Sequence, residues 1–147
     1  MQDQKPESRP VHSSCRISSI EVQLHSQTVR IIALRGEHDL ATSRAIEIAL
    51  ATHGGQDILV DLCGASFIDS SVINTLLRSA RAHAGSVQLV AGHCSFPRRV
   101  LGLARIQQVV PIHGDLAAGL ASMDARQVEQ RVRREYAFGA SARSTDA

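Results

Sequence analysis

Aromatic residues are scarce in this sequence. Its 147 residues include no tryptophan, one tyrosine and three phenylalanines. The hydrophobic content is nevertheless 44%, which is typical of a globular chain rather than a disordered one. A core must therefore be built from Ile, Leu, Val and Ala. A chain of this length suits a single domain and is long enough to bury such a core.

Other absences exclude classes of function. A net charge of +2 is small, and without a basic patch interleaved with aromatics it does not indicate nucleic-acid binding. No apolar run approaches the length of a membrane span. The N-terminal stretch MQDQKPESRPVHSS has no hydrophobic segment of the signal-peptide type. We therefore expect a cytoplasmic protein with no direct contact to nucleic acid or membrane.

The sequence also lacks the patterns that carry catalysis or bind metals. Cys15, Cys63 and Cys94 contain no C-x-x-C pair, which favours free thiols in a reducing compartment over disulfides or zinc. No two of the seven histidines stand four residues apart, so we expect no metal site. Phosphate-binding loops and hydrolase motifs are missing. Asp61, inside an apolar run, is interpreted as a carboxylate with local backbone partners. We expect neither enzymatic activity nor a cofactor.

Hydrophobic periodicity predicts the strands. Alternation with a period of two and short apolar runs indicate strands at 20–24, 29–36, 57–64, 86–92 and 108–112. The first two form a hairpin across residues 25–28. The third is a continuous apolar run, which is typical of a central strand covered on both faces. Pro111 in the last run indicates the edge of a sheet.

Helical spacing alternates with these strands. Asp39 begins a helix in which Ala41, Ala45, Ile48, Ala49 and Thr52 recur at helical spacing. A second helix, at 71–84, carries one apolar stripe, and a third, at 95–106, begins with Ser95 as its cap. Asp115 caps a fourth helix. We therefore predict an α/β fold, a mixed sheet of four or five strands with helices packed against it.

Composition divides the chain into three parts. Residues 1–14 hold almost no apolar side chains and are expected to form a flexible leader. Residues 15–123 form the predicted domain, and 124–147 form a basic helical extension and tail. In the extension, Val128, Val132 and Tyr136 recur among charged residues. A solvated helix is preferred there over a contact helix for a partner. Residues beyond Gly139 are expected to be disordered.

The stretch SFIDSSVINTLL, residues 66–77, places three helix-start residues in a row. Asp69, Ser70 and Ser71 are all good N-caps, and a helix needs only one. One serine hydroxyl would serve as the cap. The second would lie beside the positive end of the helix dipole, where an anion is tolerated. A phosphate there would add about −1.5 to −2 charges without disturbing the fold. The pattern favours a phosphorylation switch, whereas the simpler interpretation is a cap alone.

Two motifs together resemble a known family. GEHDLATSRAIEIAL is followed, after one strand, by VDLCGASFIDSSVINTLL. A G-E-x-D loop after the second strand and D-S-S at the start of a helix are typical of STAS domains. Within that family, the chain resembles the bacterial anti-sigma factor antagonists most specifically. The resemblance covers about residues 15–123, and it implies the STAS fold.

The resemblance also implies a function and a site. In such antagonists the second serine of D-S-S accepts phosphate, which corresponds to Ser71, with Ser70 as the alternative. Asp39, Asp69 and both serines would contact the partner, as would Val72, which stands where the family often has glycine. The implied partner is an anti-sigma factor of the serine-kinase type, bound by the unphosphorylated form so that a sigma factor is released. The alternative is a non-catalytic STAS scaffold or sensory module of a larger assembly.

Overall fold

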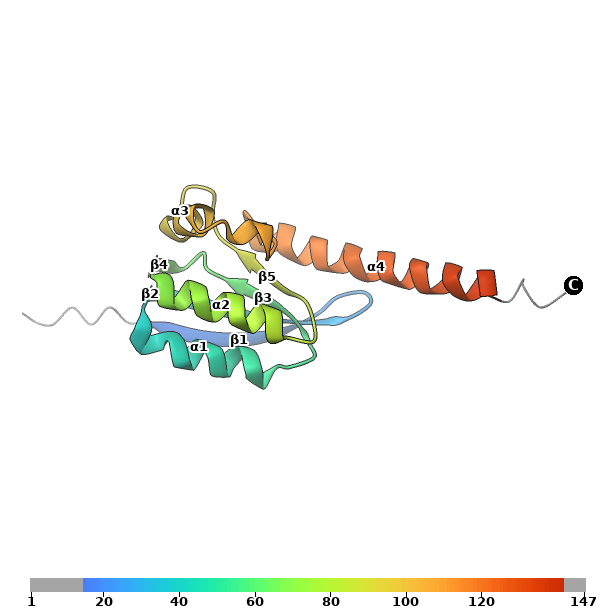
Figure 1. Ribbon diagram of the computed structural model, residues 1–147, viewed down its shortest axis with the longest axis horizontal. Helices are drawn as coiled ribbons and strands as arrows, with labels where there is room; N and C mark the ends of the chain where they lie inside the picture. Colours follow the sequence, from blue (N-terminus) through green and yellow to red (C-terminus); the bar gives the residue numbers. More distant parts are fainter. Residues whose placement is uncertain (1–14, 142–147) are drawn as a thin grey trace, which may run out of the picture.

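The computed structural model describes residues 15–141, with side chains to residue 137. The predicted leader, 1–14, and the last residues of the predicted tail, 142–147, lie outside the described residues. Six strands and four α-helices follow one another along the chain (Figure 1). In order they are β1 (Arg16–Gln23), β2 (Thr28–His38), α1 (Leu40–Thr52), β3 (Asp57–Asp61), β4 (Ala65–Ile68), α2 (Ser70–Ala82), β5 (Val87–Val90), α3 (Phe96–Leu103), a 3₁₀ turn η1 (Ile106–Gln108), β6 (Ile112–His113) and α4 (Leu116–Ser141).

The sheet is mixed, as predicted. Its order is β1-β2-β3-β5-β6, with β1 and β2 paired antiparallel as the expected hairpin. The pairs β2–β3, β3–β5 and β5–β6 are parallel. β6 lies at the edge of the sheet and shares only Ile112 with the predicted strand, since η1 ends at Gln108 and a turn follows it.

Strand β4 is the element that the sequence did not predict. Its four residues lie between the predicted strand at 57–64 and the predicted helix at 71–84, and they bring the sheet to six strands. β4 pairs parallel with the end of β2, from Gly36 to His38, and the register shifts by one residue between Gly36 and Glu37. Gly36 has φ +81°, a left-handed conformation that glycine adopts without strain. The Phe67 ring stacks on Phe96 at 5.5 Å and joins β4 to α3.

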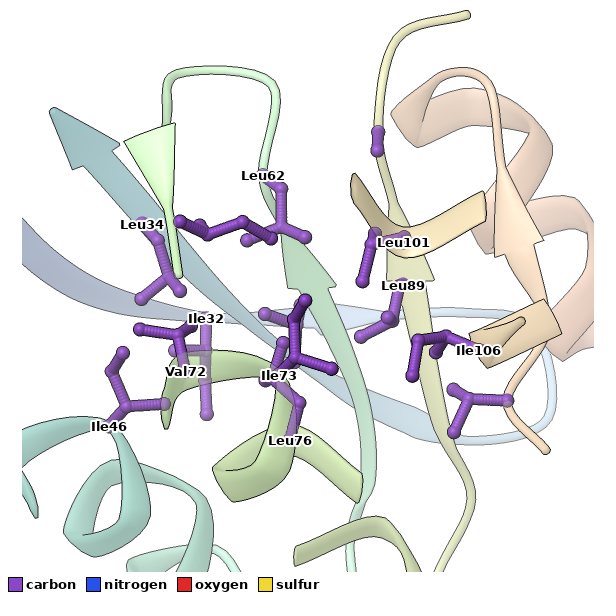
Figure 2. Packing of buried hydrophobic residues seen from close by; sticks show 14 of the residues in the cluster. Ile32, Leu34, Ile46, Leu62, Val72, Ile73, Leu76, Leu89, Leu101 and Ile106 are labelled. Carbon is purple, nitrogen blue, oxygen red and sulfur yellow. The ribbon is translucent and has the colours of Figure 1, made fainter. Parts of the chain in front are cut away.

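The core has two parts, one on each face of the sheet. Because side chains alternate along a strand, Ile58 and Val60 of β3 belong to the larger cluster, and Leu59 belongs to the smaller one. Helices α1, α2 and α3 contribute to the larger cluster (Figure 2), and α4 contributes Met123 to the smaller. The prediction that β3 is covered on both faces is confirmed.

Three helices start at their predicted caps, whereas α2 is capped by the Asp69 carboxylate rather than by a serine hydroxyl. Asp39, Asp69 and Ser95 accept backbone hydrogen bonds at the starts of α1, α2 and α3, and Asp115 does so for α4. Helix α4 continues to Ser141, past the point where the sequence predicted disorder. None of the helices described is both long enough and apolar enough to cross a membrane.

Candidate functional site

Pairing of β2 with β4 brings two helix starts together. His38 and Ile68, the last residues of these strands, are register partners. Each is followed by an aspartate that caps a helix, Asp39 for α1 and Asp69 for α2. Because the strands are parallel, both chains leave the sheet at the same end. The G-E-x-D loop and the D-S-S motif, which lie thirty residues apart in the sequence, are therefore adjacent.

Asp39 forms the exposed part of this site. Its side chain accepts the Ala41 backbone N–H at 2.9 Å, and the Thr42 hydroxyl accepts the Asp39 backbone N–H at 3.1 Å, which completes a capping box. Under this turn lies His38, fully buried, with Nε2 2.9 Å from the Arg35 carbonyl and Nδ1 3.3 Å from the Thr42 hydroxyl. His38 was not among the predicted site residues, and only its place beside Asp39 in the sequence pointed to it.

Asp69 joins the two helix starts. Its Oδ1 accepts the Ser71 hydroxyl at 2.5 Å and the Val72 backbone N–H at 3.1 Å. Burial raises the pKa of this carboxyl. The hydrogen bonds from the Ser71 hydroxyl and from the backbone N–H groups of Val72, Ser71 and Leu40 outweigh that effect and hold the pKa below its usual range. Leu40 is the first residue of α1, so the carboxylate that caps α2 also lies close to the start of α1.

The two serines are not equivalent. Ser70, the first residue of α2, is exposed, whereas Ser71 is half-buried against α1. The Ser71 hydroxyl donates its proton to Asp69, and Ser71 Oγ lies 3.1 Å from the buried hydroxyl of Ser43. Because Ser71 has only one hydroxyl proton, Ser43 is the donor in that contact. The cap of α2 is Asp69, so both serines are surplus to capping.

The Val72 side chain does not lie at the surface, where contact with a partner was expected. Its side chain is fully buried in the larger core cluster (Figure 2). A side chain buried in the core cannot touch a partner, so the predicted partner contact of Val72 does not fit this structure. The helical twist directs Val72 inward when Ser70 points outward, about 200° around the helix. Asp39, Asp69, Ser70 and Ser71 form the surface of the turn, and we call these four residues the serine site.

Ionisable groups elsewhere have local structural roles. Asp61 accepts the Cys63 backbone N–H at 2.9 Å, as its interpretation predicted. Burial and the hydrogen bond and negative charge of Asp61 raise the pKa of the Cys63 thiol to about 11. All three cysteines are free and exposed. Among residues 15–141, no three His, Cys, Asp or Glu side chains are grouped so that they could hold a metal ion.

Two cavities lie away from the serine site. One, of about 640 Å³, opens between the C-terminal halves of α1 and α2 and is lined by Leu50 and His83 among others. The other, of about 280 Å³, lies under α4 and is lined by Asp57, Gln88 and Arg126 among others. Neither cavity is lined by Asp39, Asp69, Ser70 or Ser71.

Comparison with solved structures identifies the fold. An anti-sigma factor antagonist from Mycobacterium paratuberculosis shares 20% identity, with 73% of this chain and 93% of that chain covered at a TM-score of 0.62. A candidate anti-sigma factor antagonist from Thermotoga maritima shares 17% identity. It covers 71% of this chain and 92% of its own at a TM-score of 0.54. The Bacillus cell fate determinant SpoIIAA in its phosphorylated form shares 19% identity. It covers 72% of this chain and 99% of its own at a TM-score of 0.50.

Sequence comparison alone finds no such likeness. No protein-family model matches this chain, and no curated protein matches its sequence. The structural likeness covers more than nine-tenths of each solved chain. The protein therefore has the STAS-like fold of the anti-sigma factor antagonists, as its two motifs implied.

Proposed function

We propose that this protein is a bacterial anti-sigma factor antagonist that acts in the cytoplasm and has no catalytic activity. In its unphosphorylated form it binds an anti-sigma factor of the serine-kinase type, and a sigma factor is thereby released. Phosphorylation of Ser71, or alternatively of Ser70, ends that binding. The binding surface comprises the serine site together with the neighbouring exposed turn of α1.

One observation carries this proposal. The two motifs of the resemblance come into contact at the serine site, where Ser43 of the first motif donates to Ser71 of the second at 3.1 Å, in the fold that the antagonists have. Capping accounts for Asp39 and Asp69 but for neither serine hydroxyl. The exposed Ser70 and the half-buried Ser71 both lie beside a helix start, where an added anion is tolerated.

A phosphate on Ser71 would change the site in two ways. It would remove the proton that Ser71 donates to Asp69, and it would place a dianion beside a carboxylate whose lowered pKa keeps it charged. The phosphate must then turn outward, away from Asp69 and Ser43. A partner fitted to the neutral turn would meet both added charge and added bulk there.

The test uses a serine-kinase anti-sigma factor from the same cell, with ATP. We expect one phosphate per chain by mass spectrometry, and loss of kinase binding once it is attached. Ser71→Ala should abolish labelling but retain binding, and Ser71→Asp should weaken binding. Ser70→Ala is the matched control, and it should leave labelling unchanged. If only Ser70→Ala removes the phosphate, the acceptor is Ser70. If neither variant affects labelling, the serines have no such role.

The second candidate is a scaffold or sensory STAS module of a larger assembly. It is favoured by helix α4, which continues well beyond its contacts with the sheet. Truncation after Gln127 keeps every hydrogen bond between α4 and the body. An antagonist should retain kinase binding after this truncation, whereas a module that assembles through α4 should lose its partner.

A further inference from the structure

The smaller of the two cavities lies between helix α4 and the amino ends of two parallel strands. Its volume is about 280 Å³. On the side of the sheet it is lined by Asp57, the first residue of β3, and by Ser86, which directly precedes β5. On the other side it is lined by one stretch of α4 that includes Met123, Arg126 and Gln127. We call this cavity the α4 pocket.

Polar side chains line most of the α4 pocket, although it lies against the smaller core cluster. One aspartate, one serine, one arginine and three glutamines line it, and Met123 is the one large apolar residue among them. Gln88 is fully buried, and a buried amide must be hydrogen-bonded to be tolerated. Such a lining suits a small polar ligand rather than an apolar one.

Hydrogen-bond donors gather around the Ser86 hydroxyl, at one side of the pocket. Arg126 Nη1 donates to Ser86 Oγ at 2.8 Å, and Gln88 Nε2 lies 3.5 Å from the same oxygen. His113 Nε2 lies 2.6 Å from Gln88 Oε1, and because an amide oxygen only accepts, the Gln88 N–H groups are turned toward Ser86. Within the described residues, Ser86 Oγ accepts but does not donate, and one of the five Arg126 N–H groups is used.

Asp57 supplies an acceptor on the other side of Ser86. Its Oδ1 accepts the Ser86 backbone N–H at 2.7 Å, and its Oδ2 accepts from Gln127 Nε2 at 3.3 Å. A carboxylate has about four acceptor positions, so others remain open. In the part of the chain whose side chains are described, neither Asp57 nor Arg126 takes part in an ion pair. A carboxylate and a guanidinium therefore line one cavity without pairing with each other.

We propose that the α4 pocket binds a free α-amino acid whose side chain is uncharged. The carboxylate of the ligand accepts hydrogen bonds from Arg126, from the Ser86 hydroxyl and from the Gln88 amide. The ammonium of the ligand donates to Asp57. Each charge of the ligand thus meets the opposite charge of the pocket, in hydrogen bonds of the stronger, charge-assisted kind.

The dimensions of the pocket agree with this ligand. Asp57 and Arg126 bind the backbone N–H and the hydroxyl of the same residue, so about one residue separates their charged groups. The ammonium and carboxylate of an α-amino acid are attached to one carbon, and a hydrogen bond of about 2.8 Å at each end spans such a gap. A volume of about 280 Å³ is at the lower limit of ligand cavities, which suits an amino acid better than a nucleotide.

Ligands with a single charge fit the α4 pocket less well. An anion such as phosphate would pair with Arg126 but would lie near the Asp57 carboxylate, and a simple amine would meet the reverse problem. A charged side chain would bring a third charge to the pocket. The remaining polar groups there are the amides of Gln127 and Gln130, which suit a neutral side chain.

The α4 pocket and the serine site lie at opposite ends of the sheet. Asp57 and Ser86 lie at the amino ends of β3 and β5, whereas Asp39 and Asp69 follow the carboxyl ends of β2 and β4, and all four strands run parallel. A bound amino acid therefore leaves the serine site open. It also links Arg126 of α4 to the sheet, so binding should stabilise the folded chain.

Thermal unfolding tests whether an amino acid binds. The full-length chain is heated with each common protein amino acid in turn, at about 1 mM. A ligand that binds only the folded chain raises the unfolding temperature. We expect a rise with at least one amino acid whose side chain is uncharged, and a dissociation constant below about 1 mM by calorimetry. If none binds, or if only those with a charged side chain do, the proposal is overturned.

Blocked forms of the amino acid that binds test its two charges. The N-acetyl derivative lacks the ammonium, and the amide derivative lacks the carboxylate. Each should bind at least about tenfold more weakly than the free amino acid, because one charge-assisted contact is lost. A blocked form that binds as tightly as the free amino acid would contradict the contact assigned to that charge.

Substitutions test whether the α4 pocket is the site. Arg126→Gln and Asp57→Asn should each raise the dissociation constant at least about tenfold, and Arg126→Gln should have little effect on the already weak amide derivative. Arg134→Gln, at an exposed arginine of α4 that does not line the pocket, and Asp61→Asn, at the other end of β3, are the matched controls.

Folding of the variants is checked by circular dichroism without ligand. Asp57 also holds the Ser86 backbone, whereas Arg126 is exposed, so Arg126→Gln keeps the test decisive if Asp57→Asn is unstable. A folded Arg126→Gln chain that binds as tightly as wild type would overturn the proposal. None of these measurements needs an anti-sigma factor, so their outcome is independent of the proposed function.

Discussion

Helices α1 and α2 invite comparison because they are built alike. Each has thirteen residues, each follows a strand that ends at the same edge of the sheet, and each is capped by an aspartate. Both contribute to the same core cluster. They differ in how clearly the sequence marks the buried side, and in what surrounds the cap.

The buried side of α2 is evident in the sequence, whereas that of α1 is not. In α2 the predicted stripe is confirmed, since Ile73 and Leu76 are buried. In α1 the helix is confirmed, but Ala41 and Ala45 are exposed and Ile48 is 52% exposed. The buried residues are Ser43, Ile46 and Leu50. A small polar residue occupies the buried side of α1, while apolar residues lie on its outer side, so periodicity alone selects the wrong side.

The largest expected effect tests this assignment within α1. Ile46 is fully buried and Ile48 is half exposed, two residues further along the same helix. Ile46→Ala should lower the free energy of unfolding by about 2–5 kcal/mol, because it leaves a cavity in the core. Ile48→Ala should change it by less than about 0.5 kcal/mol. Chemical denaturation of the two variants measures both, and equal losses would show that α1 is rotated from its described orientation.

The same contrast explains how much the sequence could predict. The hairpin, β3, the stripe of α2 and the caps of α1, α3 and α4 follow from local patterns, namely periodicity and cap residues. Strand β4 does not, because its four residues are buried only at the two ends of the strand and show no period of two. The contacts of Ser43 with Ser71, and of Leu40 with Asp69, join residues about thirty positions apart. Such contacts exist only once β2 and β4 have paired.

The second expected effect compares the two caps. The carboxyl of Asp39 accepts one hydrogen bond from its own helix, whereas that of Asp69 accepts two, from the Val72 backbone N–H and from the Ser71 hydroxyl. Asp69→Ala should therefore cost about 2 kcal/mol of unfolding free energy, and Asp39→Ala about 1 kcal/mol or less. Thermal or chemical denaturation at neutral pH measures the difference. Equal costs would mean that the bridging contacts of Asp69 add nothing to stability.

Acid should abolish the contribution of the Asp69 carboxylate to the stability of the fold. The pKa of Asp69 lies below its ordinary value of 3.8 in the folded protein. The resulting stabilisation is therefore present above that ordinary value, and it is lost as pH falls through the lowered pKa. Asp69→Asn lacks this titration, so the difference in stability between wild type and Asp69→Asn should shrink between neutral pH and about pH 2. A difference that stays constant with pH would contradict the assigned role of this carboxylate.

The smallest expected effect separates the two serines without any kinase. Ser71→Ala removes the hydroxyl that donates to Asp69, and it should cost about 1 kcal/mol. Ser70→Ala removes an exposed hydroxyl with no described partner inside residues 15–141, so it should change stability by less than about 0.5 kcal/mol. In Ser71→Ala the Asp69 pKa should also rise toward its ordinary value, so acid unfolding would begin at higher pH than in wild type. Because the Ser71 hydroxyl stabilises the turn by this bond, a phosphate there must first break it, whereas a phosphate on Ser70 would not. Equal stability and equal acid transitions in the two alanine variants would remove this physical distinction between the serines.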